Sequence, residues 1–178
     1  MANLLVRWVC AAIVLLYGFA KLNGSQFTIL DSELDKPMGH VSGFWLTWHY
    51  FGYSTVYGTF LALVQIGGAI LLTFRRTTLL GASILAPVLA NIVLIDLCYG
   101  VEPGATLVAL LLLCGMLSIL APHAKDLWRL FFEAQTGEAP RSVAMSSARW
   151  FARIAIVTLA CGFTYWVANF NNRAPSPI

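Results

Sequence analysis

Long apolar runs separated by short polar segments dominate the chain. A helix that crosses the hydrocarbon core of a bilayer needs about 20 mostly apolar residues. Five segments meet this requirement, at residues 4–22, 53–74, 77–99, 103–121 and 150–170. The pattern therefore predicts an all-α membrane protein with five spanning helices.

The lengths of the polar links predict how these segments are arranged. The second and third segments are joined around Arg75 and Arg76, and the third and fourth by residues 100–102. Links this short make consecutive helices antiparallel neighbours. Three parts of the chain are therefore expected: a four-helix membrane domain at 1–125 with an outer loop at 23–51, a cytoplasmic amphipathic segment and linker at 126–149, and a fifth transmembrane helix with its tail at 150–178. In the second part, the spacing of Leu127, Leu130 and Phe131 predicts a surface-lying helix over 123–134.

Composition and charge support a membrane setting. Hydrophobic residues make up 59% of the chain and charged residues 11%, against about 25% charged residues in soluble domains. This excludes a soluble globular domain and a disordered chain. With the N-terminus in the cytoplasm, only Lys21, Lys36 and Arg173 of the 11 basic residues lie outside, which fits the positive-inside rule. We expect the C-terminus outside and the first segment retained, not cleaved as a signal peptide.

The sequence holds no autonomous catalytic motif. The four cysteines lie in apolar stretches and form no C-x-x-C pair, so we expect them to be packing residues. Glycine-rich nucleotide loops and a G-x-S-x-G nucleophile motif are also missing from the sequence. Gly67 and Gly68 are expected to allow close helix packing. Whether the chain is an enzyme stays open at this point.

Polar side chains inside the apolar segments are the candidate binding residues, because each costs free energy in hydrocarbon unless it finds a partner. Lys21 and Asp96 both fall near the outer boundary, and we expect them to pair across two helices. Tyr17 lies one turn below Lys21 on the same face. Gln65 and Asn91 would line the wall of an outward-opening pocket. Arg7, near the inner boundary, either reaches the lipid headgroups or has a buried role.

The outer loop ends in an aromatic stretch that contains Trp48 and His49. Two interpretations are open: a surface-lying or re-entrant segment, and a lid over the pocket. We count Trp48 and His49 among the candidate ligand-binding residues. The loop also carries three acids and two histidines, but their spacing is not that of a metal site and we expect none.

Several short motifs follow one another in a characteristic order. They are Y-G-x-x-K-L at 17–22, Gln65-Ile66-Gly67-Gly68-Ala69-Ile70-Leu71-Leu72, Phe74-Arg75-Arg76-Thr77, Leu80-Gly81-Ala82, Asn91-Ile92-Val93 and Tyr99. Over residues 4–125 this order resembles the DoxX-like family of small bacterial integral membrane proteins. The resemblance implies a four-helix membrane bundle in the bacterial cytoplasmic (inner) membrane, and some relatives are subunits of a thiosulfate:quinone oxidoreductase.

The resemblance gives functional weight to Lys21, Gln65 and Asn91. Relatives often carry Glu where this chain has Gln65, so a titratable group is missing here. The resemblance implies an accessory or quinone-facing subunit of a membrane redox complex, an oxidoreductase subunit with a quinone as its cofactor. Two alternatives remain: a stand-alone binder or transporter of a small molecule, and a structural membrane anchor. The expected partners are the lipid bilayer and other membrane or redox subunits, and no nucleic acid.

Overall fold

The computed structural model describes residues 2–133 and 143–171, and all the secondary structure in these two ranges is helical. The helices are α1 (Ala2–Leu22), α2 (Asp31–Leu34), α3 (Gly43–Tyr53), α4 (Thr55–Thr73), α5 (Thr78–Tyr99), α6 (Pro103–Leu120), α7 (Ala124–Trp128) and α8 (Val143–Asn171). Short 3₁₀ turns cover Met38–His40 and Ala121–His123. The chain divides into two units between Leu127 and Trp128.

Four helical stretches among the described residues are long and apolar enough to cross a membrane. They are Leu4–Leu22, Thr55–Thr73, Thr78–Tyr99 and Pro103–Trp128. The predicted all-α class is thus confirmed, and so is the prediction of four helices long and apolar enough to span a membrane, as in a multi-pass membrane protein. In α8, the apolar stretch among the described residues is Ile154–Trp166, which is shorter than a span. The fifth span therefore stays a prediction.

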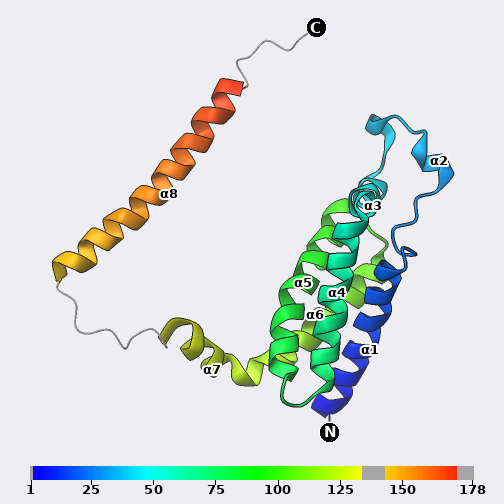
Figure 1. Cartoon of the computed structure of the whole chain (residues 1–178), viewed down its shortest axis with the longest axis horizontal. Coiled ribbons are helices and arrows are strands. Elements are labelled where there is room, and N and C mark those ends of the chain that lie inside the picture. Colours follow the sequence, from blue (N-terminus) through cyan, green and yellow to red (C-terminus); the bar gives the residue numbers. More distant parts are fainter. Residues whose placement is uncertain (1, 134–142, 172–178) are drawn as a thin grey trace. The chain divides into compact units, whose positions relative to one another are not determined.

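The four long helices form an antiparallel bundle (Figure 1). Helix α1 packs on α4, α4 on α5, α5 on α6, and α6 returns to α1. Helices α1 and α5 therefore lie across the bundle from each other. The buried core between the four helices includes Val14, Leu72, Leu85 and Met116.

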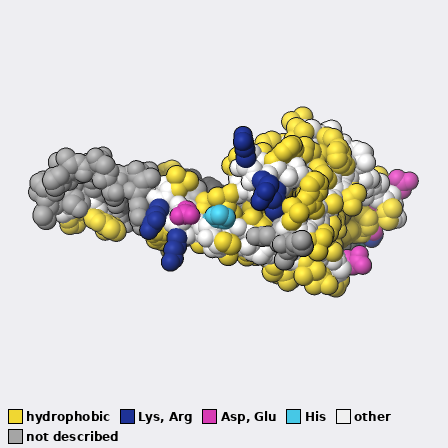
Figure 2. Space-filling view, turned by 90° about the horizontal axis from the view of Figure 1, so that it is seen from below, with side chains coloured by type: hydrophobic (Ala, Val, Ile, Leu, Met, Phe, Trp, Pro, Cys, Tyr) yellow, Lys and Arg dark blue, Asp and Glu magenta, His cyan; other side chains and the backbone are white. Residues whose placement is uncertain are grey.

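Large apolar side chains remain exposed around the bundle. Figure 2 views this unit from the end at which α1 begins, and hydrophobic side chains cover much of its flanks, whereas Lys and Arg are few. Leu63 of α4, Leu94 of α5 and Leu111 of α6 are each more than half exposed. Such a surface suits a hydrocarbon environment, because lipid tails solvate it without penalty.

Glycines set the spacing of the helices in the bundle. A Cβ atom on Gly81 would lie 2.8 Å from the carbonyl oxygen of Gly68 and 2.9 Å from the backbone nitrogen of Leu72. Helices α4 and α5 are therefore in close backbone contact here, as small residues permit in membranes. The packing role predicted for Gly68 is confirmed. That predicted for Gly67 is wrong, because nothing lies within 4 Å of a Cβ placed there.

The segment after α6 differs from the single amphipathic helix predicted over 123–134. Helix α7 ends at Trp128 and a π-helical turn follows at Arg129–Glu133. Trp128 and Phe132, four residues apart, stack with ring centroids 4.2 Å apart. Leu130 is exposed. Residues 134–142 lie outside the described ranges, as do the chain termini at 1 and 172–178.

Candidate functional site

Helix α3 lies at one end of the bundle, beside the start of α4 and the end of α5 (Figure 1). The hydroxyl of Ser42 accepts a hydrogen bond from the backbone nitrogen of Trp45 and so caps the helix. Gly43 lies against α5, since a Cβ there would be 2.8 Å from the carbonyl oxygen of Tyr99. The aromatic stretch of the outer loop is therefore a helix fixed to the bundle. We call this end of the bundle the α3 end.

Aromatic side chains form a connected group at the α3 end. We call five of them the aromatic cap: Phe27, Phe44, Trp48, Phe51 and Tyr57. Trp48 stacks on Phe44 with ring centroids 4.1 Å apart and meets Phe27 edge-on at 5.8 Å. Phe51 stacks on Phe27 at 5.4 Å and lies parallel to Tyr57 at 6.1 Å. These contacts hold α3, the preceding loop and α4 together.

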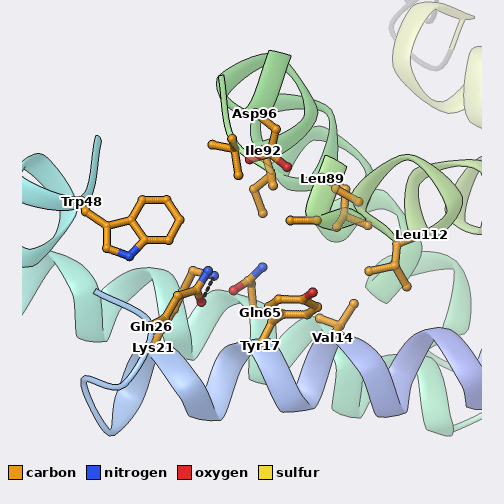
Figure 3. Close-up of a pocket in the computed structure, with 13 residues that line it drawn as sticks. Val14, Tyr17, Lys21, Gln26, Trp48, Gln65, Leu89, Ile92, Asp96 and Leu112 are labelled. Atoms are coloured by element: carbon orange, nitrogen blue, oxygen red, sulfur yellow. Dashed lines mark hydrogen bonds between the residues drawn. The ribbon is translucent and has the colours of Figure 1, made fainter. Parts of the chain in front are cut away.

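Two cavities lie below the aromatic cap and share a polar wall. The larger, of about 250 Å³, lies between α4 and α5, and the smaller, of about 60 Å³, lies in the bundle interior beside Val14 and Leu112. The two cavities have six lining residues in common: Lys21, Gln26, Trp48, Gln65, Ile92 and Asp96. Figure 3 shows that Asp96 approaches the smaller cavity from the side opposite to Lys21 and Tyr17.

The expected ion pair between Lys21 and Asp96 is not formed. Lys21 donates a hydrogen bond of 2.8 Å from Nζ to Oε1 of Gln26 (Figure 3). The ion pair within 4.0 Å found in the described ranges joins Lys36 to Glu33. Lys21 and Asp96 lie on α1 and α5, at opposite corners of the bundle. The cavity therefore separates them, and they make no direct contact. Both charged residues line the two cavities.

A tight turn after α1 explains why Lys21 meets Gln26. Gly24 has a φ of 76°, in the left-handed region that favours glycine. The backbone nitrogen of Gln26 then donates to the carbonyl oxygen of Ala20 at 3.1 Å. This reversal returns the chain to the end of α1 and sets the Gln26 side chain beside Lys21. Sequence reasoning missed Gln26, although the preceding Asn23-Gly24 pair is a common turn signal.

Gln65 is the most deeply buried polar residue of the site. It is only 2% exposed, and its Oε1 has no hydrogen-bond partner. A buried acceptor without a partner costs about 1–3 kcal/mol. In Figure 3 the Gln65 side chain points from α4 into the space between Tyr17 and Asp96. The structure therefore leaves this buried acceptor without a donor.

The other predicted site residues fall into three groups. Tyr17 lines the smaller cavity, and its ring centroid lies 5.9 Å from Nζ of Lys21. Asn91 lines the larger cavity but is exposed at its edge. Trp48 lines both cavities, whereas His49 faces a shallow surface pocket on the other side of α3. His49 is therefore not brought together with the other residues.

Arg7 has a structural contact at the opposite end of the bundle. Its guanidinium donates to the carbonyl oxygen of Leu72 at 2.8 and 3.1 Å and to that of Thr73 at 3.1 Å. These carbonyls end α4, where they have no partner within the helix. A cation there also opposes the negative end of the helix dipole. Of the two alternatives left open for Arg7, the structure shows the partly buried one.

The outer loop shows no group of three or more potential metal ligands within the described ranges. Glu33 is 8% exposed and bonds to Lys36 through one oxygen, while its Oε2 has no hydrogen-bond partner. The acids of the loop therefore do not converge on one point.

Comparison with known proteins gives one similar protein. The chain is 40% identical over 103 residues to the uncharacterized protein YwoB of Bacillus subtilis (strain 168). The match covers 57% of this chain and 64% of that relative's length. No family model matches the chain, and no solved structure matches it.

Proposed function

We propose that this protein binds a small amphipathic molecule in the cavities below the aromatic cap. The observation that carries the proposal is the unpartnered Oε1 of Gln65, buried at the wall of a cavity that also holds Lys21 and Asp96. Buried polar groups are normally satisfied by hydrogen bonds. A molecule with a polar head in the cavity would supply the missing partner.

The composition of the cavity walls supports an amphipathic ligand. The larger cavity combines six polar residues with apolar residues such as Phe60, Val64 and Ile95. The polar residues are Lys21, Gln26, Thr47, Gln65, Asn91 and Asp96. Sites for small molecules are lined mainly by apolar and aromatic side chains, with a few polar groups that orient the ligand. At about 250 Å³ the space suits a head group or a short chain segment, not a macromolecule.

The membrane setting of this binding function is part of the proposal. We propose that the protein lies in the bacterial cytoplasmic membrane with its N-terminus inside, so that the α3 end faces outward. The count of basic residues supports this orientation. We also propose that α8 is the fifth spanning helix and that the chain is DoxX-like, on the motifs at 17–22, 65–72 and 91–93.

A second candidate function is that of a quinone-facing subunit of a membrane redox complex. The observation that favours it is the pairing of a donor, Lys21 Nζ, with the flat rings of Phe27 and Trp48 at the same cavity. A quinone head is flat and carries two carbonyl acceptors, which suit such groups. In this case the protein has protein partners in the membrane as well as a ligand.

Purification in a mild detergent tests the proposal. Extraction and mass spectrometry of the purified protein should find a small molecule in stoichiometric amount, and the Lys21→Met and Gln65→Leu variants should lose most of it. The matched control is Leu94→Ala, at an exposed position of α5 that lines neither cavity. An equal amount in all four proteins would mean that the molecule is not held at this site.

The same preparation separates the two candidates. A stoichiometric protein partner together with a bound quinone supports the redox subunit. A small molecule without a protein partner supports the stand-alone binder.

A further inference from the structure

The space between α4 and α5 changes along their length. Near Gly68 and Gly81 the two backbones touch, as the 2.8 Å distance from a Cβ on Gly81 shows. Toward the α3 end, side chains from both helices border the larger cavity instead. They are Tyr57, Phe60, Leu61 and Val64 from α4, and Val88, Asn91, Ile92 and Ile95 from α5. The cavity therefore occupies the gap where the two helices separate.

This gap runs from the bundle interior to the outside of the helix pair. Among its lining residues, Gln65 is 2% and Asp96 9% exposed, whereas Phe60 is 60% exposed and Asn91 is also exposed. Both helices are candidate membrane spans at these positions. When these helices cross a bilayer, the outer edge of the cavity faces hydrocarbon. An exposed amide such as that of Asn91 costs free energy in hydrocarbon. It can also offer a hydrogen bond to the polar head of a molecule that enters the cavity.

The charges of the inner wall define the head group that fits. Lys21 and Asp96 carry opposite charges at the same cavity, so the wall has no net charge, and a head group without net charge keeps the site balanced. Oε1 of Gln65 needs a hydrogen-bond donor. A hydroxyl group donates to that oxygen and accepts from Lys21. The apolar walls at Phe60, Val64 and Ile95 suit the tail.

We propose that the larger cavity is a lateral opening between α4 and α5, through which a neutral, hydroxyl-bearing amphipath enters from the bilayer. The hydroxyl head lies at Gln65 and Lys21, and the apolar tail extends between the two helices toward the lipid. The inference rests on the proposed binding function and adds the class of ligand and its route of entry.

Quenching of tryptophan fluorescence in lipid vesicles tests the ligand class. The full chain is reconstituted in phosphatidylcholine vesicles, and 2-bromohexadecan-1-ol is compared with 2-bromohexadecane, which lacks the hydroxyl. The signal is the saturable quenching that disappears in Trp48→Phe, because Trp48 lines both cavities. We expect the alcohol to bind about fivefold more tightly than the hydrocarbon, the value of one hydrogen bond, and Gln65→Leu to remove the difference. Equal quenching by both probes overturns the hydroxyl class.

A matched pair of variants on α4 tests the route. Val64→Phe fills the gap, whereas Leu63→Phe adds the same side chain at a neighbouring exposed position that lines neither cavity. In Val64→Phe, the alcohol should quench at least about tenfold less effectively, which corresponds to a loss of about 1.4 kcal/mol of binding free energy. In Leu63→Phe, it should quench as in the parent protein. Val64→Ala, which widens the gap, should retain binding and shows that position 64 tolerates substitution.

Equal quenching in Val64→Phe and Leu63→Phe overturns the lateral route. If a co-purified molecule still depends on Lys21 and Gln65 while the alcohol probe fails, the binding function stands and the ligand class proposed here is wrong.

Discussion

Lys21 donates its hydrogen bond to Gln26, at 2.8 Å, although the carboxylate of Asp96 lines the same cavity. The partner of the lysine is therefore local in sequence, and the opposite charge lies across open space. A polar molecule in that space can interact with both groups at once. The site is arranged as two halves that a ligand completes.

The hydrogen bond between Lys21 and Gln26 should be measurable as a coupling energy. In a double-mutant cycle with Lys21→Met and Gln26→Leu, we expect a coupling of about 1 kcal/mol in detergent. Either single substitution already removes the hydrogen bond, so the double variant should lose less stability than the sum of the two single losses. Thermal unfolding of the four proteins gives this value. A coupling indistinguishable from zero would show that the two side chains do not meet.

Replacement of Arg7 should destabilise the bundle. Arg7→Met leaves the carbonyl oxygens of Leu72 and Thr73 without their donor, and we expect a loss of about 2 kcal/mol. Arg7→Lys should recover part of the loss, since the ammonium keeps the charge but not the planar fork. The control is Arg75→Met, at an exposed position in the short link after α4. If both methionine variants melt at the same temperature as the parent protein, the hydrogen bonds of Arg7 to the end of α4 contribute nothing to stability.

Two glycines on α4 and α5 should respond differently to alanine. Gly81→Ala places a Cβ 2.8 Å from the backbone of α4 and should cost about 2 kcal/mol, because the helices must separate. Gly67→Ala meets no atom within 4 Å and should leave thermal stability unchanged or slightly higher. The reverse order of the two melting temperatures would contradict the close packing of α4 on α5.

The proposed orientation is accessible to cysteine labelling in intact cells. With the native cysteines replaced, Ser32→Cys in the exposed α2 should react with an impermeant maleimide. Arg76→Cys, in the link between α4 and α5, should react only after the membrane is opened. Ser176→Cys, beyond the described residues, should label like position 32 if α8 spans the membrane. If position 76 labels in intact cells and position 32 labels only after the membrane is opened, the orientation is the reverse of the one proposed.

The four long helices could be predicted from the sequence almost to their ends. The apolar run at 4–22 becomes α1 at Ala2–Leu22, and Pro103 opens α6, because hydrophobic length and proline act locally. The length of α8 was underestimated, since its first turns carry a mixed polar sequence. The π turn after Trp128 could not be predicted, because it leaves no pattern in the order of polar and apolar residues.

The residues of the site could be named from the sequence, but not their contacts. The cost of burying a polar group singles out Lys21, Gln65 and Asp96, and all three line the larger cavity. The contacts depend on tertiary packing between residues far apart in the sequence, which local sequence patterns do not predict. Arg7 bonds to Leu72, 65 positions away, and helices α1 and α5 lie across the bundle from each other instead of side by side.

The central claim is that the cavity below the aromatic cap holds a ligand, and an experimental structure of the full chain in nanodiscs made directly from its native membrane tests it most directly. We predict non-protein density within hydrogen-bond distance of the Gln65 side chain, between Lys21 and Asp96, continuing toward the gap between α4 and α5. An empty or collapsed cavity in which Lys21 bonds directly to Asp96 would contradict the account.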